Sequence, residues 1–170
     1  MRLHIRIALP ADVETVGAML ADPEYVHTKV RASGALNHTV DVATSPAGAF
    51  TVTTRRSMPT DQIPANFRTF IGAGLDVRQV EAWEAPADDG RSGTVVVEIA
   101  GAPVRLTGTT SLRPGEGGSV LTYEGEVKAT IRLFAAAVEK AAVDAIRSIL
   151  AAEEAVARSW LTGNRAASTP

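Results

Sequence analysis

Three polar side chains on predicted strands carry groups that can bind or activate a carbonyl: His38, Arg56 and Tyr123. Each lies on the same strand face as alternating apolar residues, so the parity of its strand directs it toward the interior. Together they could orient a polar head group, or polarise and protonate a carbonyl oxygen. Each also fits an ordinary role, since a histidine or arginine at a strand end can reach water and a tyrosine often completes a core. We therefore treat all three as candidate ligand-binding residues and predict no catalytic residue.

Other patterns lack the spacing that their chemistry requires. The histidines His4, His27 and His38 do not have the spacing of metal ligands. The glycines at 72–74 and 115–117 each precede a strand rather than a helix, which excludes a dinucleotide-binding turn. The chain contains no cysteine, which excludes thiolate chemistry, and no Gly-x-Ser-x-Gly sequence. We therefore predict neither a metal nor a cofactor.

The composition is that of an ordinary globular protein. The 170 residues are 45% hydrophobic and 21% charged, with a formal net charge of −2, which disfavours nucleic acid as a partner. This length allows a core and a cavity in one domain, and we predict a single domain over residues 1–162 followed by a flexible tail over 163–170. The N-terminus lacks the apolar core of a signal peptide, and no apolar run is long enough to cross a bilayer. We therefore expect a cytoplasmic protein without stable membrane insertion, while its oligomeric state is left open.

The longest predicted element is a helix over residues 131–161, which contains neither glycine nor proline. Apolar residues recur in it at intervals of three or four, the spacing of one helix face. That face consists of Phe134, Val138, Ala142, Ala145, Ile149, Ala152, Val156 and Trp160. Because much of it is alanine, the helix needs a broad surface to pack on.

The rest of the chain supplies that surface as strands. Residues 3–9 alternate between apolar and other side chains, which predicts a half-buried strand. Two short helices follow, and the second begins with an aspartate N-cap at Asp22. Over residues 35–131 the apolar pattern has a period of two, and the short turns between strands predict antiparallel neighbours. The pattern shifts parity near Arg78-Gln79, where we expect a β-bulge.

These elements predict an α+β fold: a curved antiparallel sheet of about seven strands wrapped around a long C-terminal helix, with two short helices after the first strand. Three stretches are similar to known proteins: ADPEYVHTKV at 21–30, GAPVRLTGTTSLRP at 101–114 and GEVKATIRLFAAAVEKAAVDAIRSIL at 125–150. Together with the element order, they resemble the START-like superfamily, also called SRPBCC or birch-pollen-allergen-like, which has the helix-grip fold. The chain looks most like an actinobacterial branch of that superfamily.

The resemblance implies a cavity between the sheet and the C-terminal helix, which in this superfamily commonly holds a lipid, sterol, polyketide or other apolar molecule. Small residues on the helix and on the last two strands leave two alternatives, an open space or close packing of helix against sheet. The connection over residues 57–74 is long and apolar, and it is predicted either to gate the cavity or to plug one end of it. The residues expected to line the cavity are His38, Arg56, Met58, Phe67, Phe70, Ile71, Leu106, Gly108, Tyr123, Gly125, Val138, Ala142, Ala145 and Ile149.

We therefore predict a protein that binds a hydrophobic or lipid-like small molecule in this cavity without catalysis. Two alternatives use the same fold: an enzyme of the polyketide cyclase, aromatase or dehydratase kind, and a protein-interaction or chaperone-cofactor domain. An inward cluster of His38, Arg56 and Tyr123 would favour the enzyme, and an apolar lining would favour the binder. A filled core with an exposed apolar patch would favour the interaction domain.

Overall fold

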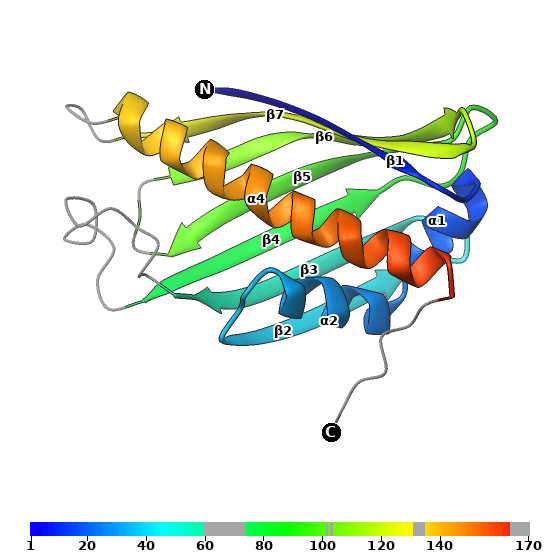
Figure 1. Ribbon diagram of the computed structural model, residues 1–170, viewed down its shortest axis with the longest axis horizontal. Coiled ribbons are helices and arrows are strands. Elements are labelled where there is room, and N and C mark those ends of the chain that lie inside the picture. Colours follow the sequence, from blue (N-terminus) through cyan, green and yellow to red (C-terminus); the bar gives the residue numbers. More distant parts are fainter. Residues whose placement is uncertain (60–73, 101, 103, 131–134, 164–170) are drawn as a thin grey trace.

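The computed structural model describes residues 1–59, 74–100, 102, 104–130 and 135–163. They form an α+β structure in which α2 and α4 lie on one face of a seven-stranded antiparallel sheet (Figure 1). The elements in chain order are β1 (Arg2–Leu9), α1 (Val13–Leu20), α2 (Pro23–Ala32), β2 (Asn37–Thr44), β3 (Phe50–Met58), β4 (Leu75–Trp83), β5 (Arg91–Ala100), β6 (Val104–Gly115), β7 (Gly118–Ala129) and α4 (Ala135–Leu161). Of the predicted tail, only residue 163 is described.

The strand order across the sheet is β1-β7-β6-β5-β4-β3-β2, and all neighbours are antiparallel. The strands from β2 to β7 therefore form one meander, and the first strand of the chain joins its far edge beside β7. The predicted α+β fold, with a sheet of seven strands and a long C-terminal helix, is confirmed.

The two short helices each begin at an aspartate N-cap, and the one at Asp22 was predicted from the sequence. The Asp12 carboxylate accepts a hydrogen bond from the Thr15 backbone N–H at 2.7 Å, which starts α1. The Asp22 carboxylate accepts one from the Glu24 N–H at 2.8 Å, which starts α2. These bonds satisfy donors that the first turn of a helix leaves unpaired. Both helices confirm the predicted pair after the first strand.

The long helix α4 crosses the sheet diagonally and contacts α2 beside it (Figure 1). Its fully buried residues are Val143, Leu150, Glu153 and Ala157. The alanine-rich row that was predicted to face the sheet does not coincide with these buried residues. Ala145, which belongs to that row, is exposed. Alanine fits packed and open surroundings alike, so an alanine-rich pattern does not define the centre of a helix face.

The strand β4 pairs without interruption with β3 and β5, so the β-bulge expected near Arg78-Gln79 is wrong. Its inward row consists of Val77, Gln79, Glu81 and Trp83, all of them buried. Gln79 and Glu81 are polar but occupy inward positions, so the apolar residues of the sequence change parity there although the backbone is regular. The shift therefore marks buried polar side chains rather than a bulge.

The packed part of the interior lies toward the α1 end of the sheet. There the rings of Phe50 and Trp83 stack with their centroids 6.0 Å apart, and Tyr25 contacts Trp160 edge to face at 5.6 Å. Leu112 on β6 has no exposed surface. Aromatic pairs in these geometries add to the burial of their area, so this end of the sheet is closed by side chains and the other end is left to the site.

A pair of glycines brings β6 and β7 unusually close together. Gly108 lies directly opposite Gly125 in the register of these strands. A Cβ atom at residue 108 would lie 2.1 Å from the carbonyl oxygen of Glu124 and 2.8 Å from the Cα of Gly125. The glycine predicted to line a cavity therefore permits a close approach of two backbones instead.

We expect Gly108→Ala to lower the free energy of unfolding by about 1–3 kcal/mol, because the added methyl group forces the two strands apart. Urea unfolding measures this change. Gly74→Ala is the matched control, since none of the described residues lies within 4 Å of a Cβ at that position. Equal stability of the two variants would contradict a close approach at residue 108.

Candidate functional site

A cavity of about 790 Å³ lies between α4 and the inner face of the sheet. Pockets for small molecules usually measure about 300–1,000 Å³, so this one can enclose a ligand of that class. The aliphatic side chains of its sheet wall are Leu3, Met58, Leu75, Val77, Val95, Val97, Ile99, Val104, Leu106 and Val127. The helix wall is contributed by α4, whose lining side chains are mostly small or aliphatic and include Asp144, Ser148 and Glu153. The C-terminal end of α2 closes one side. The lining is therefore apolar over most of its extent.

One end of this cavity is polar and belongs to a buried cluster of six side chains. Four of them line the cavity: Arg56, Gln79, Tyr123 and Glu153. The other two, Lys29 from α2 and Glu81 from β4, complete the cluster behind them. We call these six residues the polar cluster. It joins α2, β3, β4, β7 and α4, which are far apart in the sequence.

Glu81 is the most highly bonded member of the polar cluster. Its Oε1 lies 3.3 Å from the Lys29 ammonium nitrogen and accepts a hydrogen bond from Gln79 Nε2 at 2.7 Å. Its Oε2 accepts a hydrogen bond from the Tyr123 hydroxyl at 3.3 Å. Glu81 is 2% exposed, so these partners replace the water that the carboxylate has lost.

Arg56 and Glu153 form the side of the cluster nearest the cavity. The Arg56 Nη2 donates to Gln79 Oε1 at 2.9 Å, and its Nη1 lies 3.6 Å from Glu153 Oε1. The other Glu153 oxygen lies 3.7 Å from Lys29 Nζ. Two cations and two carboxylates thus face one another, and their formal charges cancel.

The electrostatics keep Glu81 and Lys29 charged at neutral pH. Burial opposes ionisation of Glu81, but the Lys29 charge and hydrogen bonds from Gln79 and Lys29 outweigh it and lower the pKa of Glu81. Burial also opposes the charge on Lys29, but Glu81 and Glu153 raise its pKa above the ordinary value. Burial and the neighbouring Glu81 raise the pKa of Tyr123, which therefore stays a neutral hydrogen-bond donor.

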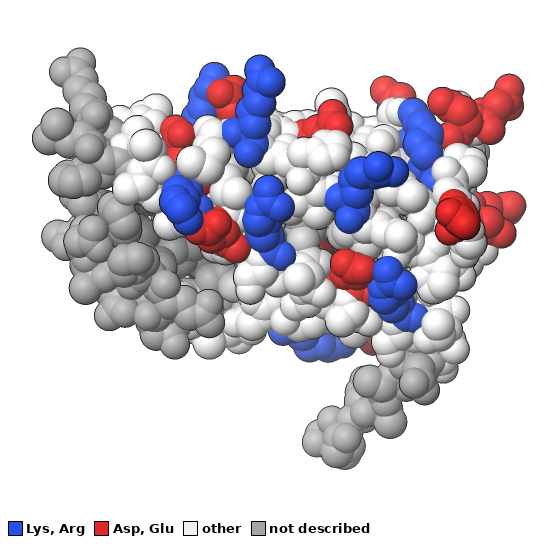
Figure 2. All heavy atoms as spheres, turned by 45° about the horizontal axis from the view of Figure 1, so that its top comes forward, with Lys and Arg blue, Asp and Glu red and all other residues white. Residues whose placement is uncertain are grey.

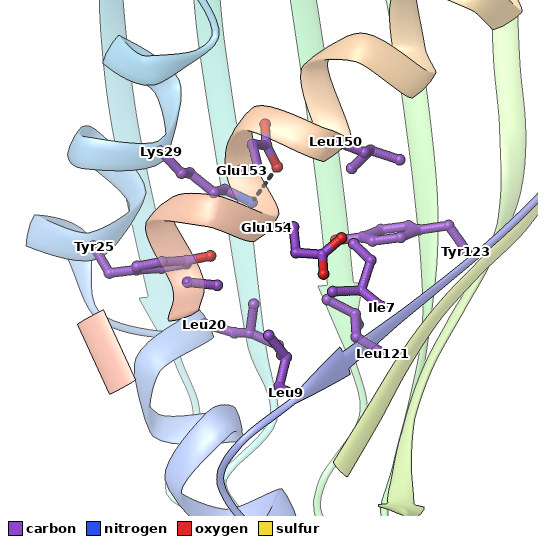
Figure 3. A pocket seen from close by; sticks show the side chains of 11 residues that line it. Ile7, Leu9, Leu20, Tyr25, Lys29, Leu121, Tyr123, Leu150, Glu153 and Glu154 are labelled. Atoms are coloured by element: carbon purple, nitrogen blue, oxygen red, sulfur yellow. Dashed lines mark ion pairs between the residues drawn. The ribbon is translucent and has the colours of Figure 1, made fainter. Parts of the chain in front are cut away.

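Figure 3 shows three members of the polar cluster, Lys29, Tyr123 and Glu153, where they line a second, much smaller pocket of about 10 Å³. Lys29 projects from α2 toward Glu153 on α4, and the ring of Tyr123 lies on the side of the sheet. A space of this size holds about one water molecule. Tyr123, Leu150 and Glu153 line both spaces, so they lie between the large cavity and the packed end.

The structure brings many of the predicted site residues onto the cavity wall, where their part in binding a ligand stays a prediction. The predicted residues that line the cavity are Arg56, Met58, Leu106, Tyr123, Gly125, Val138, Ala142, Ala145 and Ile149. Gly108 and His38 are not part of the lining. Phe67, Phe70 and Ile71 lie outside the described residues, and so does most of the 57–74 segment predicted to gate or plug the cavity.

His38 faces α2 instead of the cavity. Its Nε2 lies 3.0 Å from Nδ1 of His27, and the two rings meet edge to face. The three polar residues proposed from strand parity therefore do not all converge, because only Arg56 and Tyr123 belong to the polar cluster.

Sequence reasoning missed Lys29, Gln79, Glu81 and Glu153 as members of the site. A signal was present in each case, because each is a polar residue in an otherwise apolar row. Gln79 and Glu81 share strand parity with Trp83, and Glu153 occupies a position on the buried line of α4. Polar residues at core positions that find partners are typical of functional sites.

The outer surface contrasts with this buried charge. On the face shown in Figure 2, basic and acidic side chains are interspersed rather than gathered by sign. Exposed pairs on α4 such as Lys140–Asp144 and Arg158–Glu154 contribute to this pattern. Within the described ranges, no helix is long and apolar enough to cross a membrane. Over the same ranges, no group of three or more His, Asp or Glu side chains is placed to hold a metal ion.

The family follows from a comparison over nearly the whole chain. A family model described as "Protein of unknown function (DUF2505)" matches residues 4–161. The chain belongs to the DUF2505 family. No curated protein matches this DUF2505 chain.

Solved structures resemble the DUF2505 chain in fold at low sequence identity. The protein TTHA0849 from Thermus thermophilus has a TM-score of 0.61 and 15% identity, with 92% of this chain and 97% of that chain covered. The STAR-related lipid transfer protein from Xanthomonas axonopodis has a TM-score of 0.54 and 20% identity, with 92% of this chain and 84% of that chain covered. Human STARD10 has a TM-score of 0.55 and 13% identity, with 98% of this chain and 72% of that chain covered. The DUF2505 chain therefore has the START-like fold, as the sequence predicted, while the actinobacterial branch stays a prediction.

We expect Lys29→Met to lower the free energy of unfolding by about 3–5 kcal/mol, because Glu81 and Glu153 would be buried without one of their cations. Urea unfolding monitored by tryptophan fluorescence measures the loss. Lys140→Met is the control: it breaks an exposed pair with Asp144, which is worth about 1 kcal/mol or less. A similar cost for both substitutions would show that the polar cluster does not stabilise the fold.

A pH dependence follows from His38. Burial, followed by the nearby His27 and Arg31, lowers the pKa of His38 below its ordinary 6.5. The unfolded chain therefore binds this proton more readily, and the free energy of unfolding falls as the pH drops below 6.5. We expect His38→Gln to lose less stability than the unsubstituted protein between about pH 7.5 and pH 5.5. Urea unfolding at both pH values tests this, and equal losses would exclude the effect.

Proposed function

We propose that the protein binds a hydrophobic or lipid-like small molecule in the cavity between the sheet and α4, without catalysing a reaction on it. The observation that carries this proposal is the cavity of about 790 Å³ with aliphatic walls. Protein interiors are normally packed without spaces of this size. A second support is the START-like fold, since one structure of similar fold is a STAR-related lipid transfer protein.

The energetics of an apolar ligand fit such a cavity. Burying one CH₂ group contributes about 0.8 kcal/mol, so a chain of twelve carbons contributes about 10 kcal/mol. Association itself costs about 4–15 kcal/mol. An apolar chain alone therefore gives a modest affinity, and contacts at its polar end decide how tightly a ligand binds.

The state of the polar groups favours binding over acid–base catalysis. A general acid or base works best when its pKa lies near the operating pH. In the polar cluster, the pKa of Glu81 is lowered and those of Lys29 and Tyr123 are raised, so these three groups move away from neutrality. The cluster is therefore suited to holding a fixed pattern of charge and hydrogen bonds.

Native mass spectrometry of the purified protein tests the proposal directly, because a bound apolar molecule adds a discrete mass that organic extraction removes. Nile red, a neutral apolar dye, serves as the probe for the extracted protein. We expect Ala142→Trp, which places an indole in the cavity, to weaken binding of the dye at least about tenfold. Ala142 is half-buried on the cavity wall.

The matched control is Ala151→Trp, which adds the same ring at an exposed position of α4 outside the cavity lining. It should bind Nile red like the unsubstituted protein. Absence of co-purifying molecules together with no dye binding would refute the proposed function. Dye binding that is unaffected by Ala142→Trp would place the dye elsewhere.

A further inference from the structure

Glu153 differs from every other charged member of the polar cluster. Both oxygens of Glu81 accept hydrogen bonds, and the Arg56 Nη2 donates one. The Glu153 carboxylate accepts no hydrogen bond from any residue that the structure describes. Its two ion pairs, with Arg56 and Lys29, are 3.6 Å and 3.7 Å long. Glu153 is 5% exposed and lines the cavity, so a buried carboxylate there has unused acceptor capacity.

The charges around Glu153 leave no place for another ion. Lys29 and Arg56 are already balanced by Glu81 and Glu153. Among the described residues that line the cavity, Arg56 is the single cation, and the lining otherwise includes Glu153 and further carboxylates. A ligand carboxylate would bring an unbalanced negative charge into this site, and an ammonium group would bring an unbalanced positive one. Either is costly in a buried environment.

A hydroxyl group satisfies both constraints. It is uncharged, so the cluster stays neutral, and its O–H can donate to the unused Glu153 oxygen. A hydrogen bond to a charged acceptor is stronger than one between neutral groups. The apolar walls leave room for the remainder of the ligand on the other side.

We propose that Glu153 accepts a hydrogen bond from an uncharged hydroxyl group at the polar end of the ligand, so that the protein selects hydroxylated apolar molecules over carboxylates. This inference rests on the proposed function and adds the chemical class of the ligand to it.

Two probes of equal chain length test the selection. Dodecanol and dodecanoate differ only in the polar end, and at about pH 8 the carboxylate is ionised. Displacement of Nile red from the extracted protein gives the dissociation constant of each. We expect dodecanol to bind at least about tenfold more tightly than dodecanoate.

Glu153→Gln tests whether this residue is responsible. The amide keeps the size and an acceptor oxygen but removes a negative charge, so Lys29 and Arg56 then face Glu81 alone. We expect the preference for dodecanol to fall at least about tenfold, through tighter binding of dodecanoate. Glu154→Gln, on the neighbouring residue, is the control. Glu154 pairs with Arg158 at 2.9 Å and does not line the large cavity, so the preference should be unchanged.

The outcomes separate the two proposals. If the extracted protein binds no Nile red and no molecule co-purifies with it, the proposed function fails. If Nile red binds and dodecanol does not displace it, the inference fails. If dodecanoate binds the unsubstituted protein as tightly as dodecanol, the inference fails while the function stands. The inference also fails if Glu153→Gln still binds Nile red but leaves the preference unchanged. Bound dye in each variant shows that its cavity has formed.

Discussion

Burying charge is the constraint on which the rest of this structure depends. Lys29 and Glu81 lie 3.3 Å apart with almost no exposure, and each would cost several kcal/mol if its partner were absent. Their pairing requires α2, which packs on β2 and α4, to lie within reach of the Lys29 side chain from β4, and Glu153 extends the same requirement to α4. Local helix and strand preferences form the elements, but the polar cluster determines how the helices sit on the sheet.

The polar cluster also divides the interior into two unlike parts. On the α1 side, aromatic pairs such as Phe50–Trp83 close the core. On the other side, aliphatic side chains and alanines surround the cavity. A buried neutral cluster between them presents hydrogen-bonding atoms to the cavity at one end only. The cavity therefore has a direction, with an apolar body and a polar end, which suits an amphiphilic molecule.

The element order and the antiparallel sheet could be predicted because they follow from local patterns. Alternation predicted the strands, and Asp22 has the N-cap role predicted for it. The cluster could not be predicted in the same way, because pairing of Lys29 with Glu81 depends on packing between elements. Its trace in the sequence was the parity shift in β4, which looked like a bulge because Gln79 and Glu81 occupy buried positions. In α4, alanines occur on several sides of the helix, so the sequence did not show which line of residues packs against the sheet.

In α4, the residues that pack against the core are largely different from the residues that border the cavity. Packing stability and cavity size, which usually change together, are therefore largely separated in this helix. Val143 and Ala157 pack the helix away from the cavity and Leu150 contributes to both, whereas Ala142 and Ala145 border the cavity. Larger or smaller side chains in the second group alter the capacity of the cavity while the packed contacts stay as they are. The helix thus gives the protein a means of evolving toward ligands of different size without a loss of stability at each step.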